Sequence, residues 1–366
     1  MNGKFRYVLA DRIDYEAAER LWNASEGNDV FSHPACWRAL VESGVHSGKI
    51  ISVEVRSGEG NLAAVWPFVL AGNGARDLFS EIAQPLGAHY VDYIQPLVSQ
   101  AGNGVLDCLM DGVSSVFAAS GKMKIVKLDP LDNCAGACER LSESAKFRLR
   151  RERLSPRMHF RGSYEETEKS LGWSKKHRPS VRIRRIRKDG ALSLWVAEDR
   201  DSIQQRLEIL FDLHRKKWNS QGKPSQFEKP AERSCFLKMA ENLPLSMLHY
   251  SEVRLDEKVL SCHFGFLCGN WLYWYKPAYD PQHEGLSPGV LHIALLAEHG
   301  IGQGWQGIDF LQGDESYKFR WKNDDKPTLD FVMASSLSMP WWIWETRLRD
   351  GVREAYFSFR SRIRGG

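Results

Sequence analysis

The sequence predicts an α/β chain built from two related domains. Its 366 residues are the length of two ordinary domains rather than one. Hydrophobic residues follow strand periods and helix periods in turn along the whole chain. The order strand, two helices, strands, helix and strand in the first region returns in the second, which indicates related rather than unrelated domains.

The first region contains five strand patterns and three helix patterns. Strands are expected over residues 5–10, 49–56, 62–70, 89–96 and 123–128, and helices over 15–23, 37–44 and 105–119. Ser32 and Pro34 supply the cap and proline that open the second helix. Residues 130–145 have few β-branched side chains and are the expected boundary.

The second region begins with basic helices and continues with a run of strands. Helices are expected over residues 165–171, 175–188, 202–218, 233–241, 287–299 and 315–321, and strands over 191–197, 246–254, 259–268, 271–279, 307–311 and 328–334. The predicted units are an N-terminal domain (1–144), a basic helical linker or start of the second domain (145–190), a C-terminal domain (191–340) and an amphipathic C-terminal helix (341–366).

Composition excludes several classes of protein. With 43% hydrophobic and 26% charged residues, the chain is not disordered as a whole. Its N-terminus lacks an apolar signal region and no apolar run is long enough to span a bilayer, so a cytoplasmic location is expected. The seven cysteines are scattered without a CxxC pair, so we expect reduced thiols and no metal site.

The net charge of +4 hides a strongly basic central stretch. Residues 145–190 hold 16 Lys and Arg against 5 acids, whereas residues 1–144 hold 12 against 18. Eight of these cations lie between Lys175 and Lys188, where no acid interrupts them. This basic belt indicates contact with phosphates, although a solvated helix would carry the same pattern.

Ser287, Pro288 and Gly289 open the helix that follows the third consecutive strand. Serine as the N-cap and proline in the first turn are typical of a helix start, and glycine lets a ligand approach free backbone N–H groups. An anion site and a simple helix cap both fit this pattern.

Residues 273–321, YWYKPAYDPQHEGLSPGVLHIALLAEHGIGQGWQGIDFLQGDESYKFRW, carry a resemblance to a known superfamily. Together with the belt and Asp92-Tyr93, they resemble GNAT acetyltransferases of the type associated with cellulose and polysaccharide biosynthesis, a group similar to the Fem peptidyltransferases. The resemblance implies tandem GNAT-like domains, each a mixed central sheet flanked by helices. It also implies an N-acyltransferase that uses acyl-CoA, most simply acetyl-CoA, and an amine on an amino sugar or polysaccharide precursor.

The resemblance also assigns roles to individual residues. Acyl-CoA is expected at Ser287, Pro288, Gly289, Val290, Tyr275 and Lys276, and the acceptor at Asp92, Tyr93, Trp321 and Arg178. The catalytic candidates are Asp309, Tyr317, Lys318 and His263. Asp309 would orient or deprotonate the amine, Tyr317 would protonate the leaving thiolate and Lys318 would hold an anionic group. A structural hydrogen bond or ion pair is an equally good interpretation of each.

Two alternatives stay open. The Q/R-x-x-G-x-G/A motif of acetyl-CoA-binding GNAT proteins is missing; with the basic belt, this favours aminoacyl transfer from tRNA, as in Fem proteins. In the other alternative, a non-catalytic accessory protein of a polysaccharide machine contacts its partner or the inner membrane through the Trp-rich tail, residues 341–366.

Overall fold

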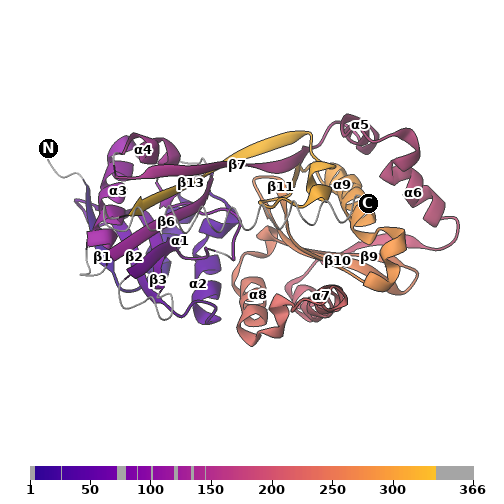
Figure 1. Ribbon diagram of the computed structural model, residues 1–366, viewed down its shortest axis with the longest axis horizontal. Coiled ribbons are helices and arrows are strands. Elements are labelled where there is room, and N and C mark those ends of the chain that lie inside the picture. Colours follow the sequence, from indigo (N-terminus) through magenta and orange to yellow (C-terminus); the bar gives the residue numbers. More distant parts are fainter. Residues whose placement is uncertain are drawn as a thin grey trace.

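A computed structural model describes residues 5–25, 27–71, 80–88, 90–99, 102–118, 123–132, 136–144 and 146–334. The chain forms two lobes that lie side by side, with two long strands running between them (Figure 1). We use first lobe for residues 5–144 and second lobe for residues 160–323. The predicted C-terminal helix, residues 341–366, lies outside the described residues.

The first lobe contains most of the predicted elements. Its elements are β1 (Phe5–Ala10), α1 (Tyr15–Asn23), η1 (Val30–Ser32), α2 (Pro34–Glu42), β2 (Lys49–Ser57), β3 (Leu62–Ala71), β4 (Ser80–Pro85), β5 (Leu97–Val98), α3 (Gly102–Ala118), β6 (Met123–Asp132) and α4 (Ala137–Glu143). Of these, β4, β5 and α4 are additional to the elements that the sequence predicts. Asp14 caps α1 by accepting from the Ala17 amide, and Pro34 occupies the first turn of α2 as expected. The predicted cap Ser32 is wrong: Ser32 lies in η1, and the side chain of His33 caps α2 by accepting from the Ala35 amide.

The second lobe contains α5 (Tyr164–Ser170), η3 (Lys175–His177), α6 (Pro179–Ile186), β8 (Leu192–Val196), α7 (Arg200–Ser220), η4 (Gln226–Glu228), α8 (Pro230–Asn242), η5 (Leu245–Met247), β9 (Leu248–Leu255), β10 (Lys258–Cys268), β11 (Trp271–Tyr279), η6 (Pro281–Leu286), α9 (Pro288–Gly302), β12 (Gly307–Asp309) and α10 (Ser316–Phe319). The connecting strands are β7 (Arg148–His159) and β13 (Asp324–Ala334).

One mixed sheet runs through both lobes in the order β1-β2-β3-β4-β6-β13-β7-β12-β11-β10-β9-β8, with β5 added to β3. The β4–β6 and β11–β12 pairs are parallel, and the other pairs of this path are antiparallel. The predicted fold class, α/β with a mixed sheet flanked by helices, is confirmed.

The connecting strands differ from the prediction in two ways. Residues 148–159 were expected in a helical linker and instead form β7, whose exposed Arg and Leu side chains hide the strand period. Residues 324–334, expected in the second domain, form β13, which pairs with β6 of the first lobe as well as with β7. The two lobes therefore share the centre of the sheet.

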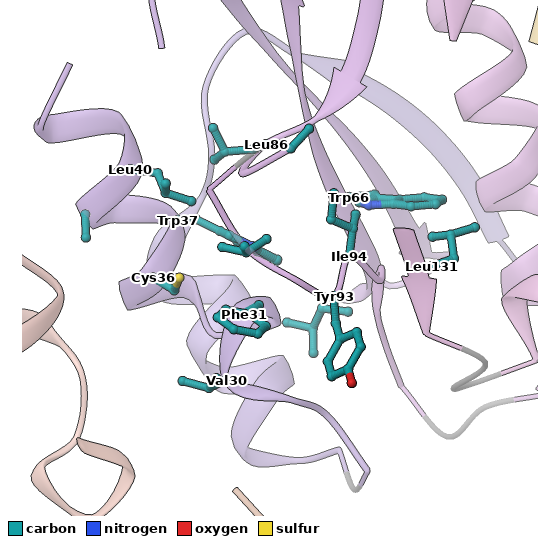
Figure 2. Packing of buried hydrophobic residues seen from close by; sticks show 14 of the residues in the cluster. Val30, Phe31, Cys36, Trp37, Leu40, Trp66, Leu86, Tyr93, Ile94 and Leu131 are labelled. Atoms are coloured by element: carbon teal, nitrogen blue, oxygen red, sulfur yellow. The ribbon is translucent and has the colours of Figure 1, made fainter. Parts of the chain in front are cut away.

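The strand predicted over residues 89–96 is wrong. Residues 90–96 form a loop with a single bridge from Ile94 to Leu131. Their apolar side chains fill the core instead of alternating across a sheet: Tyr93 and Ile94 lie beside Phe31 and Trp66, and the Tyr93 hydroxyl points out of the apolar cluster (Figure 2). This loop becomes a contact between the lobes.

Aromatic rings of the two lobes pack directly on one another. The Phe31 ring lies 5.6 Å from that of Phe266, 5.9 Å from Tyr273 and 5.7 Å from Tyr275. These buried side chains belong to one apolar core that reaches from α2 to α8. A second core lies beneath α9 and includes Trp274, Leu291 and Trp321. The lobe interface is therefore part of a buried apolar core that residues of both lobes share.

Among the described residues, no helix combines the length and apolarity needed to span a membrane. Within the same ranges, no group of three or more His, Cys, Asp or Glu side chains is arranged to hold a metal ion. The six described cysteines are free thiols.

Candidate active site

Strands β11 and β12 separate in the middle of the second lobe. Their parallel pairing covers Trp271–Tyr273 against Gly307–Asp309, after which β12 ends while β11 continues to Tyr279. A cavity of about 400 Å³ occupies this opening. We call it the splay pocket; it is lined by Lys217, Ser261, Trp274, Pro277, Ala278, Tyr279, Glu284, Ser287, Pro288, Gly289, Val290, His292, Ile293, Tyr317 and Trp321.

The N-terminus of α9 forms one wall of the splay pocket. Pro288 occupies the first turn and Ser287 the N-cap position, as expected, although the Ser287 side chain accepts no hydrogen bond from the helix amides. Ser287 has the left-handed φ of 55°, which turns its hydroxyl away from the amide groups of the first turn. Because no side chain caps these amides, the positive end of the helix dipole remains available to an anion.

Gly289 keeps the approach to these amides open. A Cβ atom added at Gly289 would have no heavy atom within 4 Å. A bound group can therefore come close to the backbone there, and a larger side chain would project into the same space without clashing with the protein.

The basic belt lies against this end of α9. Ile183 and Ile186 of α6 are buried in the core beneath α9, whereas the intervening arginines are exposed. The Arg182 guanidinium donates to the Ser287 hydroxyl and to the Leu286 carbonyl. Positive charge thus adjoins the helix terminus, an arrangement suited to a phosphate. Arg178 is the N-cap residue of α6 and does not line the splay pocket.

His263 lies behind the pocket rather than in it. It is fully buried on β10, where its Nε2 accepts the Tyr275 amide at 3.2 Å beside a bulge between β10 and β11. Gly265 makes room for the ring, since a Cβ there would lie 2.3 Å from His263 Cε1. Burial lowers the pKa of His263 well below its usual value. A neutral histidine that supports a bulge fits the structural interpretation.

Tyr317 and Trp321 line the pocket on the side of α10. The Trp274 indole N–H donates to the Tyr317 hydroxyl at 3.3 Å, and the Trp321 ring packs 5.4 Å from that of Trp173. Burial raises the pKa of Tyr317, with a further contribution from the negative charge of Glu315. Tyr317 therefore keeps its proton at neutral pH and can donate a hydrogen bond.

A second polar group lies where the lobes meet. We call Asp92, Lys276, Glu315 and Lys318 the junction cluster. Burial raises the pKa of Asp92 to about 6, against the opposing charges of Lys318 and Lys276. Burial lowers the pKa of Lys276, which donates to Gln226 Oε1 at 3.1 Å. Within the described part of the chain, Asp92 makes no hydrogen bond or ion pair.

The Lys318 ammonium group already contacts other residues of the protein. It forms an ion pair with Glu315 at 3.1 Å and donates to the Gln312 carbonyl. The junction cluster nevertheless adjoins the splay pocket along the chain, because Lys276 precedes Pro277 and Lys318 follows Tyr317, and both Pro277 and Tyr317 line the pocket. Asp92 is therefore the carboxylate of the cluster that remains available to a ligand.

Asp309 lies in the contact between the lobes. Its carboxylate is fully buried and accepts from the Tyr93 hydroxyl at 2.7 Å, the Arg157 Nε at 2.8 Å and the Leu311 amide at 2.8 Å. Neither Asp309 nor Tyr93 lines the splay pocket. With three donors already bound, Asp309 and Tyr93 fit a role in joining the lobes.

Tyr275 faces the first lobe instead of α9. Its hydroxyl donates to the Tyr90 carbonyl and its ring stacks on Phe236. The bulge beside Tyr275 changes which side chains of β11 face each side of the sheet, so simple alternation misplaces it. Neither Tyr275 nor Lys276 lines the splay pocket.

Sequence reasoning missed several residues of the site. Trp274 and His292 line the pocket and are both buried, while Lys217 and Glu284 lie at its edge. Trp274 could have been found from the aromatic run WLYWY, because a strand next to the expected helix start must wall any pocket there. Lys217 carries no such signal, since its place depends on how α7 packs on β11.

Residues 175–319 match the sequence family described as "Acetyltransferase (GNAT) domain". These residues form a GNAT acyltransferase domain. The match covers the basic belt, the start of α9 and every residue that lines the splay pocket except Trp321, so the matched segment contains nearly all of the cavity lining. No curated protein matches the whole sequence significantly.

Solved structures of similar shape cover nearly the whole chain at low identity. A structure titled FemX is 11% identical with a TM-score of 0.60, covering 92% of this chain and 99% of its own. L-PGS from Bacillus licheniformis is 11% identical with a TM-score of 0.54, covering 92% and 96%. The C-terminal domain of a putative lysylphosphatidylglycerol synthetase from Agrobacterium fabrum is 12% identical with a TM-score of 0.52, covering 87% and 91%. At these identities the likeness concerns the fold alone.

Proposed function

We propose that this protein is an N-acyltransferase that binds acyl-CoA in the splay pocket and transfers its acyl group to an amine at the junction cluster. The observation that carries the proposal is the uncapped start of α9, which opens on the pocket beside Arg182. Acetyl-CoA is the simplest donor. An amino sugar or a polysaccharide precursor is the acceptor class that the sequence resemblance favours.

The donor side supplies charge and backbone amides. The first turn of α9 and the belt arginines would bind the pyrophosphate of the coenzyme. The apolar surfaces of Pro277, Ala278 and Ile293 would hold the uncharged arm. The Tyr317 hydroxyl would donate to the sulfur as negative charge develops there.

The acceptor side supplies the base. Asp92 would take one proton from the acceptor ammonium group, and the neutral nitrogen would attack the thioester carbonyl carbon. The C–N bond forms, the C–S bond breaks, and the second nitrogen proton leaves with the sulfur as free thiol. This assigns to Asp92 the deprotonation that the sequence assigned to Asp309, because Asp92 has no competing donor and Asp309 has three.

Calorimetry with acetyl-CoA tests the donor site. We expect micromolar binding by the native protein and a loss of about 100-fold or more in Gly289→Glu, which places a carboxylate where the anion must lie. Gly302→Glu is the matched control: it alters the other end of α9, where an added Cβ likewise meets nothing within 4 Å. Equal binding by both variants would contradict the proposal.

Aminoacyl transfer from tRNA is the second candidate. The exposed cations of α6 and the fold likeness to FemX favour it. Retention of aminoacyl-tRNA that weakens steeply with salt, combined with no binding of CoA, would support this alternative. An absence of tRNA binding at low salt would exclude it.

A further inference from the structure

We infer that Trp274 and Tyr317 form the end wall of the splay pocket and restrict the donor to short acyl groups such as acetyl or propionyl. The inference rests on the proposed function, since it concerns the acyl group of the proposed donor. It adds a chain-length limit and the two residues that set it.

The two side chains meet across the opening in the sheet. Trp274 comes from β11, whereas Tyr317 comes from α10, beyond the end of β12. The hydrogen bond of 3.3 Å from the Trp274 indole to the Tyr317 hydroxyl therefore closes the gap that the separated strands leave. Both residues line the same pocket as the start of α9.

Trp274 is held in place from behind. Its ring stacks on His263 at 4.1 Å and 12° between planes, and the edge of His292 lies against it at 5.3 Å. His292 is fixed in turn by hydrogen bonds of 2.9 Å with Ser251 and with Ser261. All of these groups are buried, so an acyl chain could not push the indole aside without disturbing packed rings.

Tyr317 lies at the border between the pocket and the junction cluster. One side of the residue lines the splay pocket, and its hydroxyl lies within the electrostatic influence of Glu315 and Asp92. An acyl group that ends at this wall has its carbonyl near the side from which the amine arrives. A longer chain would have to displace the Trp274 or Tyr317 side chain from its packed position.

Calorimetry with free CoA, acetyl-CoA and octanoyl-CoA tests the wall. In the native protein we expect octanoyl-CoA to bind about tenfold more weakly than acetyl-CoA, the effect of forcing extra methylene groups against the packed Trp274 and Tyr317 side chains. Tyr317→Ala, which removes a partly exposed ring, is expected to abolish this difference. Trp274→Leu opens the same wall from the buried side and should act in the same direction.

Tyr317→Phe is the matched control, because it keeps the ring and loses only the hydroxyl; it should retain the preference for acetyl-CoA. The ratio of the two affinities is compared within each variant, so a partly unfolded sample does not affect the result. Octanoyl-CoA binding as tightly as acetyl-CoA in the native protein, or an unchanged ratio in Tyr317→Ala, would overturn the inference alone. A failure of free CoA to bind would overturn the proposed function and the inference with it.

Discussion

Replacing Asp309 by asparagine distinguishes a structural role from a catalytic one. The carboxylate is fully buried and accepts from Tyr93, Arg157 and Leu311. An asparagine amide keeps the volume but removes the negative charge that faces Arg157. Its N–H₂ group must also replace one carboxylate oxygen, so it faces either the Arg157 donor or the Tyr93 and Leu311 donors. Breaking a buried ion pair costs about 3–5 kcal/mol.

The lower end of that range applies because the Arg157 side chain is 19% exposed and can regain some hydration. With a denaturant slope of about 3 kcal/mol per molar urea, a loss of about 3 kcal/mol moves the unfolding midpoint down by about 1 M. Tyr93→Phe removes one hydrogen bond to the same carboxylate and should cost about 1.5 kcal/mol. Urea titration followed by tryptophan fluorescence measures both shifts.

Glu143→Gln is the control, because it breaks an ion pair with Arg140 in which the Glu143 side chain is 67% exposed. Its effect should stay within about 1 kcal/mol. Should Asp309→Asn unfold at the same urea concentration as this control while its turnover falls more than tenfold, the structural role would be refuted and Asp309 would be the base that the sequence predicts.

Three further predictions concern pH and charge. Because the pKa of Asp92 is raised to about 6, activity should rise as the pH increases through that value. Asp92→Asn should lose this pH dependence and most of the turnover, whereas Asp314→Asn, at an exposed position, should keep both. Burial lowers the pKa of His292 to about 3 from 6.5, so its contribution to stability is present above pH 6.5 and is lost as the pH falls toward 3. The free energy of unfolding, measured by denaturant titration, should therefore fall between pH 7 and pH 5 by about 2 kcal/mol more in the native protein than in His292→Gln. Arg182→Gln should weaken acetyl-CoA binding about threefold to tenfold at low salt, and a loss that persists at 1 M salt would show that Arg182 acts through packing rather than charge.

The sequence predicts most elements of the fold because their periods are regular and their ends are marked. Pro34 marks a helix start that the structure confirms, and the three strands of residues 248–279 are largely apolar runs separated by turns at residues 256–257 and 269–270. The sequence does not predict β7. In this strand, Leu149 and Leu154 are more than half exposed and alternate irregularly with arginines. Because these leucines point to solvent, the apolar residues of β7 do not mark its buried face, and the strand shows no clear hydrophobic period.

The parts of the site that are formed by a short stretch of backbone could be predicted from the sequence. The parts that depend on contacts between distant residues could not. Pro288 and Gly289 mark the start of α9 from their residue types alone, and the structure places a pocket there. The positions of Asp92 and Asp309 depend on the loop over residues 90–96, which reaches the other lobe. The local sequence pattern does not indicate that Asp309 accepts three hydrogen bonds while Asp92 accepts none from the described residues.

The shared strand β13 sets the order in which the protein can be completed during synthesis. It fills the space between β6 and β7, yet about 200 residues separate the end of β6 from its start. At 5–20 residues per second, the ribosome needs about 10–40 s to supply it. Throughout that interval the first lobe carries an open edge on β6, which another chain could pair with. The first lobe therefore becomes a finished sheet only after the acyltransferase domain has been made, so the two lobes mature together.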